Sequence, residues 1–267
     1  MKRISSHFAA ALLALAFTAA PAAAGPADVL PDLDQVTPTG LQVSSKLVKG
    51  KRVFRLGFAS ASANVGPGAL FVHGFRASTA DPTMQVNQIV RQTDGSARLV
   101  RDIGSMNYAI HPDHRHWHYL GFERYELRIP GNDKPSVRRD RKTGFCLGDR
   151  FPLAEAPTLP GYNPIPRHGD ECGLGEPDAL GMFVGMSTGY VDRYEAQIEG
   201  QYIDITGAPS RNYVLVHTVN PGNRILESDY SNNAASVLFS LNWRRGRDKE
   251  PTVRVLRKCP TSASCPG

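Results

Sequence analysis

The sequence predicts an all-β protein, a β-sandwich-like domain with long disulfide-pinned loops and little helix. Apolar and polar residues alternate in short segments, as half-buried strands require, and helical periodicity is hard to find. The 267 residues include 25 glycines and 20 prolines, which favour turns over helices. Alternation is absent between about residues 150 and 189, where Pro and Gly are frequent, and this predicts a long loop.

The expected strands follow from the alternation. Phe54, Leu56 and Phe58 alternate with Arg and Gly, and residues 237–243 show the same pattern. Residues 213–219 are apolar on both faces, which predicts a central strand. Weaker candidates are residues 41–48, 69–75, 84–91, 202–206 and 252–256.

The N-terminus has the composition of a secretory signal peptide. A basic start is followed by an apolar run over residues 8–20, and Ala22–Ala24 matches a small-x-small cleavage site. The apolar run is too short for a membrane span. We expect residues 1–24 to be removed and residues 25–267 to form one secreted or periplasmic domain. An uncleaved N-terminal anchor is the alternative.

The charge of the exported chain is mild. Removing Lys2 and Arg3 from the 31 basic residues leaves a net charge of +4 against 25 acidic residues. The basic residues are scattered, and no basic stripe is interleaved with aromatic residues. Nucleic acid is therefore not an expected partner.

Four cysteines in an exported chain indicate two disulfides. Pairing Cys146 with Cys172 and Cys259 with Cys265 keeps each bridge local, although four cysteines allow three connectivities. Metal ligation is the less favoured alternative, because the chain has no Cys-x-x-Cys motif.

A histidine cluster is the strongest chemical signal. Half of the eight histidines lie between residues 111 and 118. Imidazole suits copper, zinc or nickel. Surrounding apolar and aromatic residues should anchor the cluster in a folded core, whereas the alternative is a His-rich surface tract.

The spacing of His114, His116 and His118 predicts a curved backbone. In a straight strand their Cα atoms would span ~13 Å, too far for three nitrogens to reach one metal at ~2.0–2.1 Å. The apolar positions change phase between residues 121 and 124, as a β-bulge would cause. His111 is a fourth ligand or a hydrogen-bond donor to a ligand. Zinc hydrolysis and copper redox chemistry both remain open here.

These residues resemble a known family. The histidine segment with Phe122–Leu127 is similar to the copper-binding signature of lysyl oxidases. Three further stretches agree in order: residues 142–149 resemble the lysine-bearing motif, residues 185–206 the tyrosine-bearing motif and residues 220–233 the C-terminal signature. With a similar start at residues 30–33, the resemblance spans about residues 30 to 243.

The resemblance implies a secreted copper- and quinone-dependent amine oxidase with one catalytic domain over residues 25–267. His114, His116 and His118 would bind copper, and Lys142 and Tyr194 would form lysine tyrosylquinone. Such an enzyme uses O₂ to convert primary amines, either peptidyl lysine or small amines, into aldehydes with release of ammonia and H₂O₂.

Two groups of charged residues, near Lys142 and near Tyr194 in the sequence, would affect this chemistry. Arg138, Arg139 and Arg141 would lower the pKa of Lys142 and so favour the uncharged, nucleophilic amine. Asp192 and Asp204 are candidates for the base that removes a substrate proton, because both are carboxylates near Tyr194 in the sequence.

An acidic and amide-rich segment predicts a candidate calcium site. Carboxylate and amide oxygens are the ligands that Ca²⁺ prefers. The alternative is a turn held by Asx-type hydrogen bonds. The segment supplies four candidate ligands and the resemblance adds two more: Glu227, Asp229, Asn232, Asn233, Asp32 and Leu33.

The chain departs from the animal members of the family. It has fewer cysteines, Arg124 stands where those members carry a histidine, and residues 150–176 match poorly. Two alternatives stay open: a non-catalytic β-sandwich module for metal binding or adhesion, and a zinc hydrolase with three histidine ligands. The hydrolase leaves Lys142 and Tyr194 without a role.

Overall fold

The computed structural model describes residues 25–110, 115–131, 138–139, 142, 144–196, 198 and 200–267. The expected all-β class is confirmed: in this part of the chain the strands are accompanied by one short 3-10 helix, η1 (Ala156–Thr158). The strands form three antiparallel sheets. The expected signal peptide lies outside the described residues. None of the helices within the described ranges is long and apolar enough to cross a membrane.

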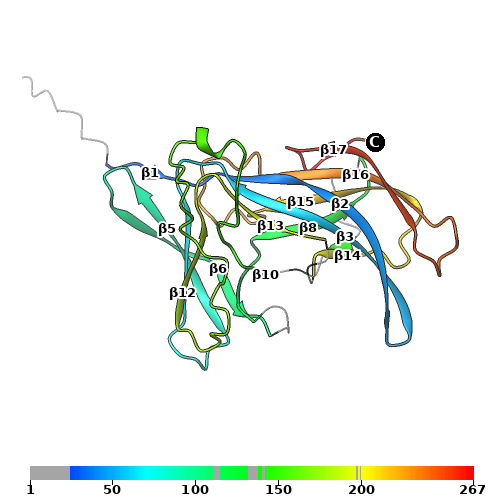
Figure 1. Ribbon diagram of the computed structural model, residues 1–267, viewed down its shortest axis with the longest axis horizontal. Coiled ribbons are helices and arrows are strands. Elements are labelled where there is room, and N and C mark those ends of the chain that lie inside the picture. Colours follow the sequence, from blue (N-terminus) through cyan, green and yellow to red (C-terminus); the bar gives the residue numbers. More distant parts are fainter. Residues whose placement is uncertain are drawn as a thin grey trace, which may run out of the picture.

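The largest sheet has seven strands and lies at one end of the molecule (Figure 1). Six of its strands follow the spatial order β10-β7-β6-β5-β4-β12, and β1 pairs with β5. Their bounds are β1 (Asp28–Val29), β4 (Leu70–Phe75), β5 (Thr83–Gln92), β6 (Ala97–Tyr108), β7 (Trp117–Leu120), β10 (Gly144–Phe145) and β12 (Gly181–Met186).

Two five-stranded sheets form the rest of the fold. One has the order β11-β13-β3-β14 with β2 paired to β3, and comprises β2 (Leu33–Val48), β3 (Lys51–Asn64), β11 (Phe151–Pro152), β13 (Tyr190–Tyr194) and β14 (Tyr202–Asp204). The other has the order β17-β16-β15-β8-β9, and comprises β8 (Glu123–Arg128), β9 (Arg138–Arg139), β15 (Arg211–Val219), β16 (Ala234–Asn242) and β17 (Thr252–Cys259).

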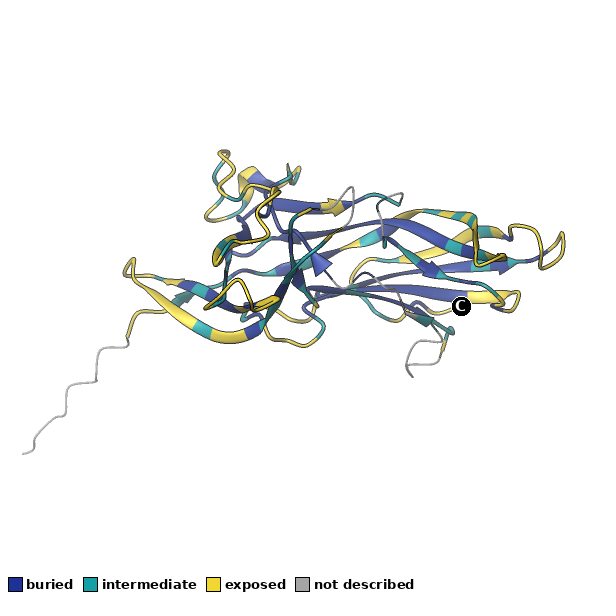
Figure 2. Ribbon diagram, turned by 90° about the horizontal axis from the view of Figure 1, so that it is seen from below, coloured by how far each residue is buried: buried dark blue, intermediate teal, exposed yellow. Residues whose placement is uncertain are grey.

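Aromatic side chains join the two five-stranded sheets. The rings of Phe58 on β3 and Tyr125 on β8 lie 4.8 Å apart, and Phe54 packs edge-on against Trp243 at 5.0 Å. Such pairs contribute ~0.5–1.5 kcal/mol beyond the burial of their area. Buried residues follow the strands of this region and exposed residues gather at the loop ends (Figure 2). The alternating face of β3 predicted from Phe54, Leu56 and Phe58 therefore lies in the core.

The β-bulge expected near Gly121 is wrong, because the change of phase in the apolar pattern has another cause. β7 belongs to the seven-stranded sheet and β8 to a five-stranded sheet, and the chain crosses between them in a turn at residues 121–122. Gly121 has φ of 75°, a conformation that favours glycine. The change of phase in the apolar pattern thus marks a change of sheet. Of the histidine segment expected to curve, the described part has His116 in a bend before β7 begins, and His114 lies outside the described residues.

Both expected disulfides are present. Cys146 is bonded to Cys172 and Cys259 to Cys265. The first pins the segment expected to be a long loop, which also contains β11, η1 and β12. It fixes the chain that follows β10 beside β7, where Trp117 N–H donates to the Cys172 carbonyl at 2.8 Å.

Candidate active site

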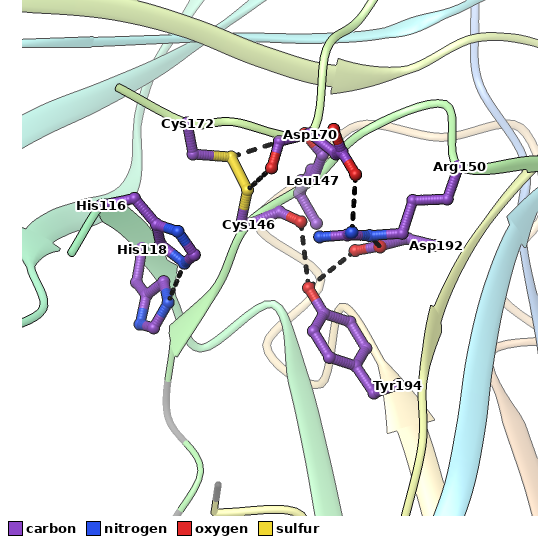
Figure 3. Close-up of a disulfide and its surroundings, with 9 residues drawn as sticks. All are labelled: His116, His118, Cys146, Leu147, Arg150, Asp170, Cys172, Asp192 and Tyr194. Carbon is purple, nitrogen blue, oxygen red and sulfur yellow. Dashed lines mark hydrogen bonds and ion pairs between the residues drawn. A yellow bond between two sulfur atoms is a disulfide. The ribbon is translucent and has the colours of Figure 1, made fainter. Parts of the chain in front are cut away.

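A cavity of about 210 Å³ brings together four of the predicted site residues, His116, His118, Lys142 and Tyr194. It lies where β7, β10 and β13 approach one another, beside the Cys146–Cys172 disulfide (Figure 3). Its lining is His116, His118, Lys142, Cys146, Arg150, Asp170, Arg193, Tyr194 and Ile198. A larger cavity of about 410 Å³, lined by Arg91, Tyr162 and Arg167 among others, contains none of the predicted site residues.

Lys142 and Tyr194 meet in this cavity although 52 positions separate them in the sequence. The Lys142 Nζ atom lies 4.4 Å from the centroid of the Tyr194 ring and 5.0 Å from that of Phe145. Both Lys142 and Tyr194 are buried. Lysine is almost never buried without a partner, so the position of Lys142 against two aromatic faces sets it apart from a solvated surface lysine.

The Tyr194 hydroxyl points toward Asp192 and the Cys146 carbonyl oxygen (Figure 3). It lies 2.8 Å from Asp192 Oδ2 and 3.0 Å from the Cys146 carbonyl oxygen, both of which can accept its proton. Arg150 Nε donates to Asp192 Oδ1 at 2.7 Å, and Arg150 also pairs with Asp170 at 2.8 Å. These bonds fix the orientation of the tyrosine ring.

Burial governs the protonation of this pocket. It raises the pKa of Asp192 to about 7, against the opposing effect of Arg150. Burial also raises the pKa of Tyr194 well above its usual value, and the negative charges of Asp192 and Glu123 add to the effect. The phenol is therefore neutral, beside a carboxyl group that titrates near neutral pH.

His116 and His118 face each other at the mouth of the cavity. Their Nε2 atoms are 2.8 Å apart. Two nitrogen ligands at ~2.0–2.1 Å from one metal lie about 2.8–3.4 Å apart for bond angles of about 90–110°. The observed separation thus suits a shared metal as well as a shared hydrogen. His111 and His114, the other members of the predicted cluster, lie outside the described residues.

Glycine allows the close approach of the two strands that carry the site. A Cβ atom at Gly144 on β10 would lie 2.5 Å from Cβ of His118 on β7. Real Cβ contacts are longer, so a side chain at this position would push His118 away. The close packing of β10 on β7 therefore explains why a glycine stands at position 144, in the segment that resembles the lysine-bearing motif.

The candidate bases Asp192 and Asp204 lie in different surroundings, and so does Arg138, which was expected to act on Lys142. Asp192 lies against Tyr194, as described, whereas Asp204 accepts a hydrogen bond from Thr206 N–H at 2.8 Å and does not line the cavity. The Arg138 guanidinium donates to the Thr206 carbonyl at 2.6 Å and lines a different cavity. Arg141 and the side chain of Arg139 lie outside the described residues.

Hydrogen bonds join five of the six candidate calcium ligands in two groups at the start of β2. Glu227 accepts hydrogen bonds from Leu33 N–H at 3.0 Å and Asn233 Nδ2 at 2.7 Å. Asn232 Nδ2 donates to Asp32 Oδ1 at 2.8 Å. Asp229 accepts from Ser231 N–H at 2.7 Å, as the alternative Asx-type turn requires.

Sequence reasoning missed two groups, Arg150 in the cavity wall and the buried Glu123. Arg150 had no distinguishing signal, because it stands in a loop without periodicity. Glu123 did have one: it continues the odd-numbered apolar positions of Tyr125 and Leu127, so a glutamate falls on the buried face of β8. Its carboxylate lies 2.8 Å from His217 Nε2.

Comparison with known proteins agrees with the motifs. The lysyl oxidase family profile matches residues 177–246. This range includes Tyr194 and the segment at 227–233, but not the histidine segment at 111–118 or Lys142. The chain is 33% identical over 124 residues to the protein-lysine 6-oxidase of Gallus gallus, an alignment that covers 46% of this chain and 25% of that protein.

Two other relatives give similar values. The Sus scrofa protein-lysine 6-oxidase is 32% identical over 127 residues, or 46% of this chain and 43% of that protein. Lysyl oxidase homolog 2 of Homo sapiens is 28% identical over 163 residues, or 59% of this chain and 19% of that protein. The chain thus spans less than half the length of these curated relatives. By its profile match and these relatives, the chain is similar to lysyl oxidase family members over the residues that the matches cover.

Proposed function

We propose that this protein is a secreted, copper-dependent amine oxidase that converts primary amines into aldehydes, with O₂ as oxidant and ammonia and H₂O₂ as products. Its substrates are peptidyl lysine or small amines. One observation carries the proposal: Lys142 Nζ lies 4.4 Å from the Tyr194 ring centroid, in the cavity that His116 and His118 also line.

We propose further that Lys142 and Tyr194 are the precursors of lysine tyrosylquinone. Bound copper and O₂ would supply the oxidation that turns the Tyr194 ring into a quinone, to which the lysine nitrogen is joined. The four rotatable bonds of the Lys142 side chain allow its amine to move the few ångströms to the ring. Burial of both residues excludes bulk water from the new bond.

His114, His116 and His118 are the proposed copper ligands. The 2.8 Å separation of the His116 and His118 Nε2 atoms supports two of them. A set of imidazole ligands suits copper, since neutral imidazole is the ligand shared by zinc, copper, iron and nickel sites. The adjacent lysine and tyrosine favour copper over zinc, because a zinc hydrolase would give them no role.

The surrounding residues have defined tasks in this proposal. Asp192 accepts the proton that leaves the Tyr194 hydroxyl or the substrate carbon, since a carboxyl group titrating near pH 7 is well matched to that transfer. Arg150 holds Asp192 in place. Asp170, whose side chain is 53% exposed, lies at the cavity wall where it would attract a substrate ammonium group.

A calcium ion is the second proposed metal. The Oδ1 atoms of Asn232 and Asn233 are buried and make no hydrogen bond within the described structure. Buried polar atoms are rarely left unsatisfied, and a cation between these oxygens and Glu227 would satisfy both. If mild chelation releases no calcium and leaves the melting temperature unchanged, the calcium proposal fails and the Asx-type turn remains.

The decisive experiment expresses the exported protein with copper in air. We expect a visible quinone absorbance, a positive carbonyl-reagent stain and, after digestion, a peptide in which Lys142 and Tyr194 are joined. Tyr194→Phe should abolish all three together with amine-dependent H₂O₂ release. Tyr202→Phe is the matched control, because Tyr202 stacks with Arg55 outside the cavity.

Two results would contradict the proposal. Copper-loaded protein with neither colour nor cross-link would favour a non-catalytic metal-binding or adhesion module. Amine-dependent H₂O₂ release that survives Tyr194→Phe would refute the cofactor assignment alone.

A further inference from the structure

A buried polar cluster lies behind the tyrosine of the candidate site. We call it the Glu123 cluster; it consists of Glu123, Tyr125, His217, Ser60 and Ser62. The first two come from β8, His217 from β15 and the serines from β3. All five are buried, and a glutamate is almost never fully buried unless it is paired.

Three donors hold the Glu123 carboxylate. Tyr125 OH donates at 2.5 Å, His217 Nε2 lies at 2.8 Å, and Ser62 Oγ donates to the other carboxylate oxygen. Burial alone would raise the pKa of Glu123, but the attraction of His217 and these hydrogen bonds outweigh it and lower the pKa. Glu123 therefore carries a negative charge inside the protein.

Strand register brings this charge to the candidate site. On the paired strands β3 and β13, Ser62 stands opposite Asp192 and Ser60 opposite Tyr194. Directly opposed residues share a face of the sheet, with Cβ atoms ~4.5–5.5 Å apart. Ser62 bonds Glu123 and Ser60 bonds Tyr125 at 2.7 Å. The Glu123 cluster is thus one side chain removed from the pair formed by Asp192 and Tyr194.

Several charged or titratable groups surround Asp192. Arg150 contacts it from the segment after β10, and Tyr194 contacts it from β13. Glu123 on β8 acts on it electrostatically, Asp170 is bonded to Arg150, and Lys142 packs on the Tyr194 ring. Arg150 favours the charged carboxylate, whereas Glu123 opposes it.

We propose that Glu123 is a positioning residue for Asp192. Its buried negative charge offsets Arg150, so that Asp192 gains and loses a proton near neutral pH rather than remaining ionised. Without Glu123, burial alone would oppose the ion pair with Arg150, so Asp192 would be ionised down to a lower pH and would be a weaker proton acceptor for Tyr194 or substrate. The role in catalysis rests on the proposed function, whereas the effect on Asp192 does not.

The test measures the protonation of the Asp192 carboxyl group directly. Infrared titration of the full exported chain, loaded with copper, reports the C=O stretch of protonated buried carboxyl groups, and the band lost in Asp192→Asn identifies Asp192. Glu123→Gln should move the midpoint of this band from about pH 7 downward by about one pH unit or more.

Glu126→Gln is the matched control. Glu126 is a buried glutamate on the same strand, but it occupies an even position and pairs with Arg128 at 2.6 Å on the opposite face. We expect no shift of the Asp192 midpoint in this variant. If Glu123→Gln fails to fold, the double variant Glu123→Gln with His217→Gln replaces the pair by two amides that can bond to each other.

An unchanged Asp192 midpoint, or an equal shift in Glu126→Gln, overturns the inference. In an active enzyme, the acid limb of kcat/KM should move to lower pH in Glu123→Gln together with the infrared midpoint, which a merely structural role would not cause. Absence of amine oxidation in the wild-type protein would refute the proposed function and leave the infrared result standing.

Discussion

Asp149→Asn should destabilise the fold strongly, because the Asp149 carboxylate ties the disulfide-pinned loop to Ser187, which lies between β12 and β13. Its Oδ2 atom accepts hydrogen bonds from Arg167 N–H at 2.8 Å, His168 N–H at 3.1 Å and Ser187 Oγ at 2.7 Å. Its Oδ1 atom accepts from Ser187 N–H at 2.7 Å. Asp149 is buried, so water cannot replace a lost acceptor.

The magnitude follows from this geometry. An asparagine offers one oxygen, and in the better orientation it keeps the three bonds made by Oδ2 and turns its NH₂ group toward Ser187 N–H. The unsatisfied buried donor costs ~1–3 kcal/mol, and the other bonds lose the strength that a charged acceptor gives them. Removing a buried charge offsets part of this loss. We expect the free energy of unfolding to fall by about 2–4 kcal/mol.

Equilibrium urea unfolding of the oxidised protein, followed by tryptophan fluorescence, measures this change. Asp94→Asn is the matched control, because Asp94 is an exposed turn residue that accepts one bond, from Ser96 N–H at 2.9 Å. The control should change the free energy by less than about 0.5 kcal/mol. A loss below about 1 kcal/mol in Asp149→Asn, or an equal loss in both variants, would refute the reasoning.

Three further predictions concern the site and its frame. Gly144→Ala should lower copper affinity at least about tenfold, because a methyl group 2.5 Å from Cβ of His118 displaces that proposed ligand. Gly169→Ala, which adds a methyl group in open space, should leave a competitive copper titration unchanged. The raised pKa of Asp192 means that the folded protein keeps a proton between about pH 4 and pH 7 that the unfolded chain releases, so stability falls as pH rises through this window. Asp192→Asn should remove up to about 4 kcal/mol of that pH dependence, and parallel curves for wild type and variant would contradict it. Replacing the Cys146–Cys172 disulfide by serines should cost about 3.5 kcal/mol, against about 2 kcal/mol for the other disulfide, because the sequence separations are 26 and 6; equal losses in urea unfolding would contradict this.

Alternation of apolar residues predicted several strands closely. Residues 69–75, 84–91 and 252–256 fall on β4, β5 and β17, and residues 213–219 form the centre of their sheet as expected. These predictions succeed because alternation records which face of a strand meets the core, and that is a local property.

The strands that were missed have no such pattern. β6 carries charged residues on both faces over much of its length, and β12 lies in the Gly- and Pro-rich segment expected to be a loop. Gly185 of β12 packs so closely on its partner that a Cβ would lie 2.2 Å from the Leu70 carbonyl oxygen. Pairing with β4 therefore makes this segment a strand, although its sequence lacks the alternation of apolar and polar residues.

The candidate site divides in the same way. The motifs indicated Lys142, Tyr194 and the histidines, and the structure brings Lys142, Tyr194, His116 and His118 to one cavity. The sequence offered two carboxylates near Tyr194, Asp192 two positions away and Asp204 ten positions away. The structure distinguishes them, because Asp192 lies on β13 with Tyr194 and accepts from its hydroxyl, whereas Asp204 on β14 accepts from Thr206 N–H.

The amino-acid order of this protein determines its β class, its local disulfides and the clustering of its histidines, because each depends on residues close together in the chain. The protonation of Asp192 and the environment of Tyr194 depend instead on distant residues. Glu123 and His217 are 94 positions apart, and Tyr194 bonds a carbonyl 48 positions away. Such contacts follow from how the strands pair and the sheets pack, since burial and opposing charges act through space rather than along the sequence.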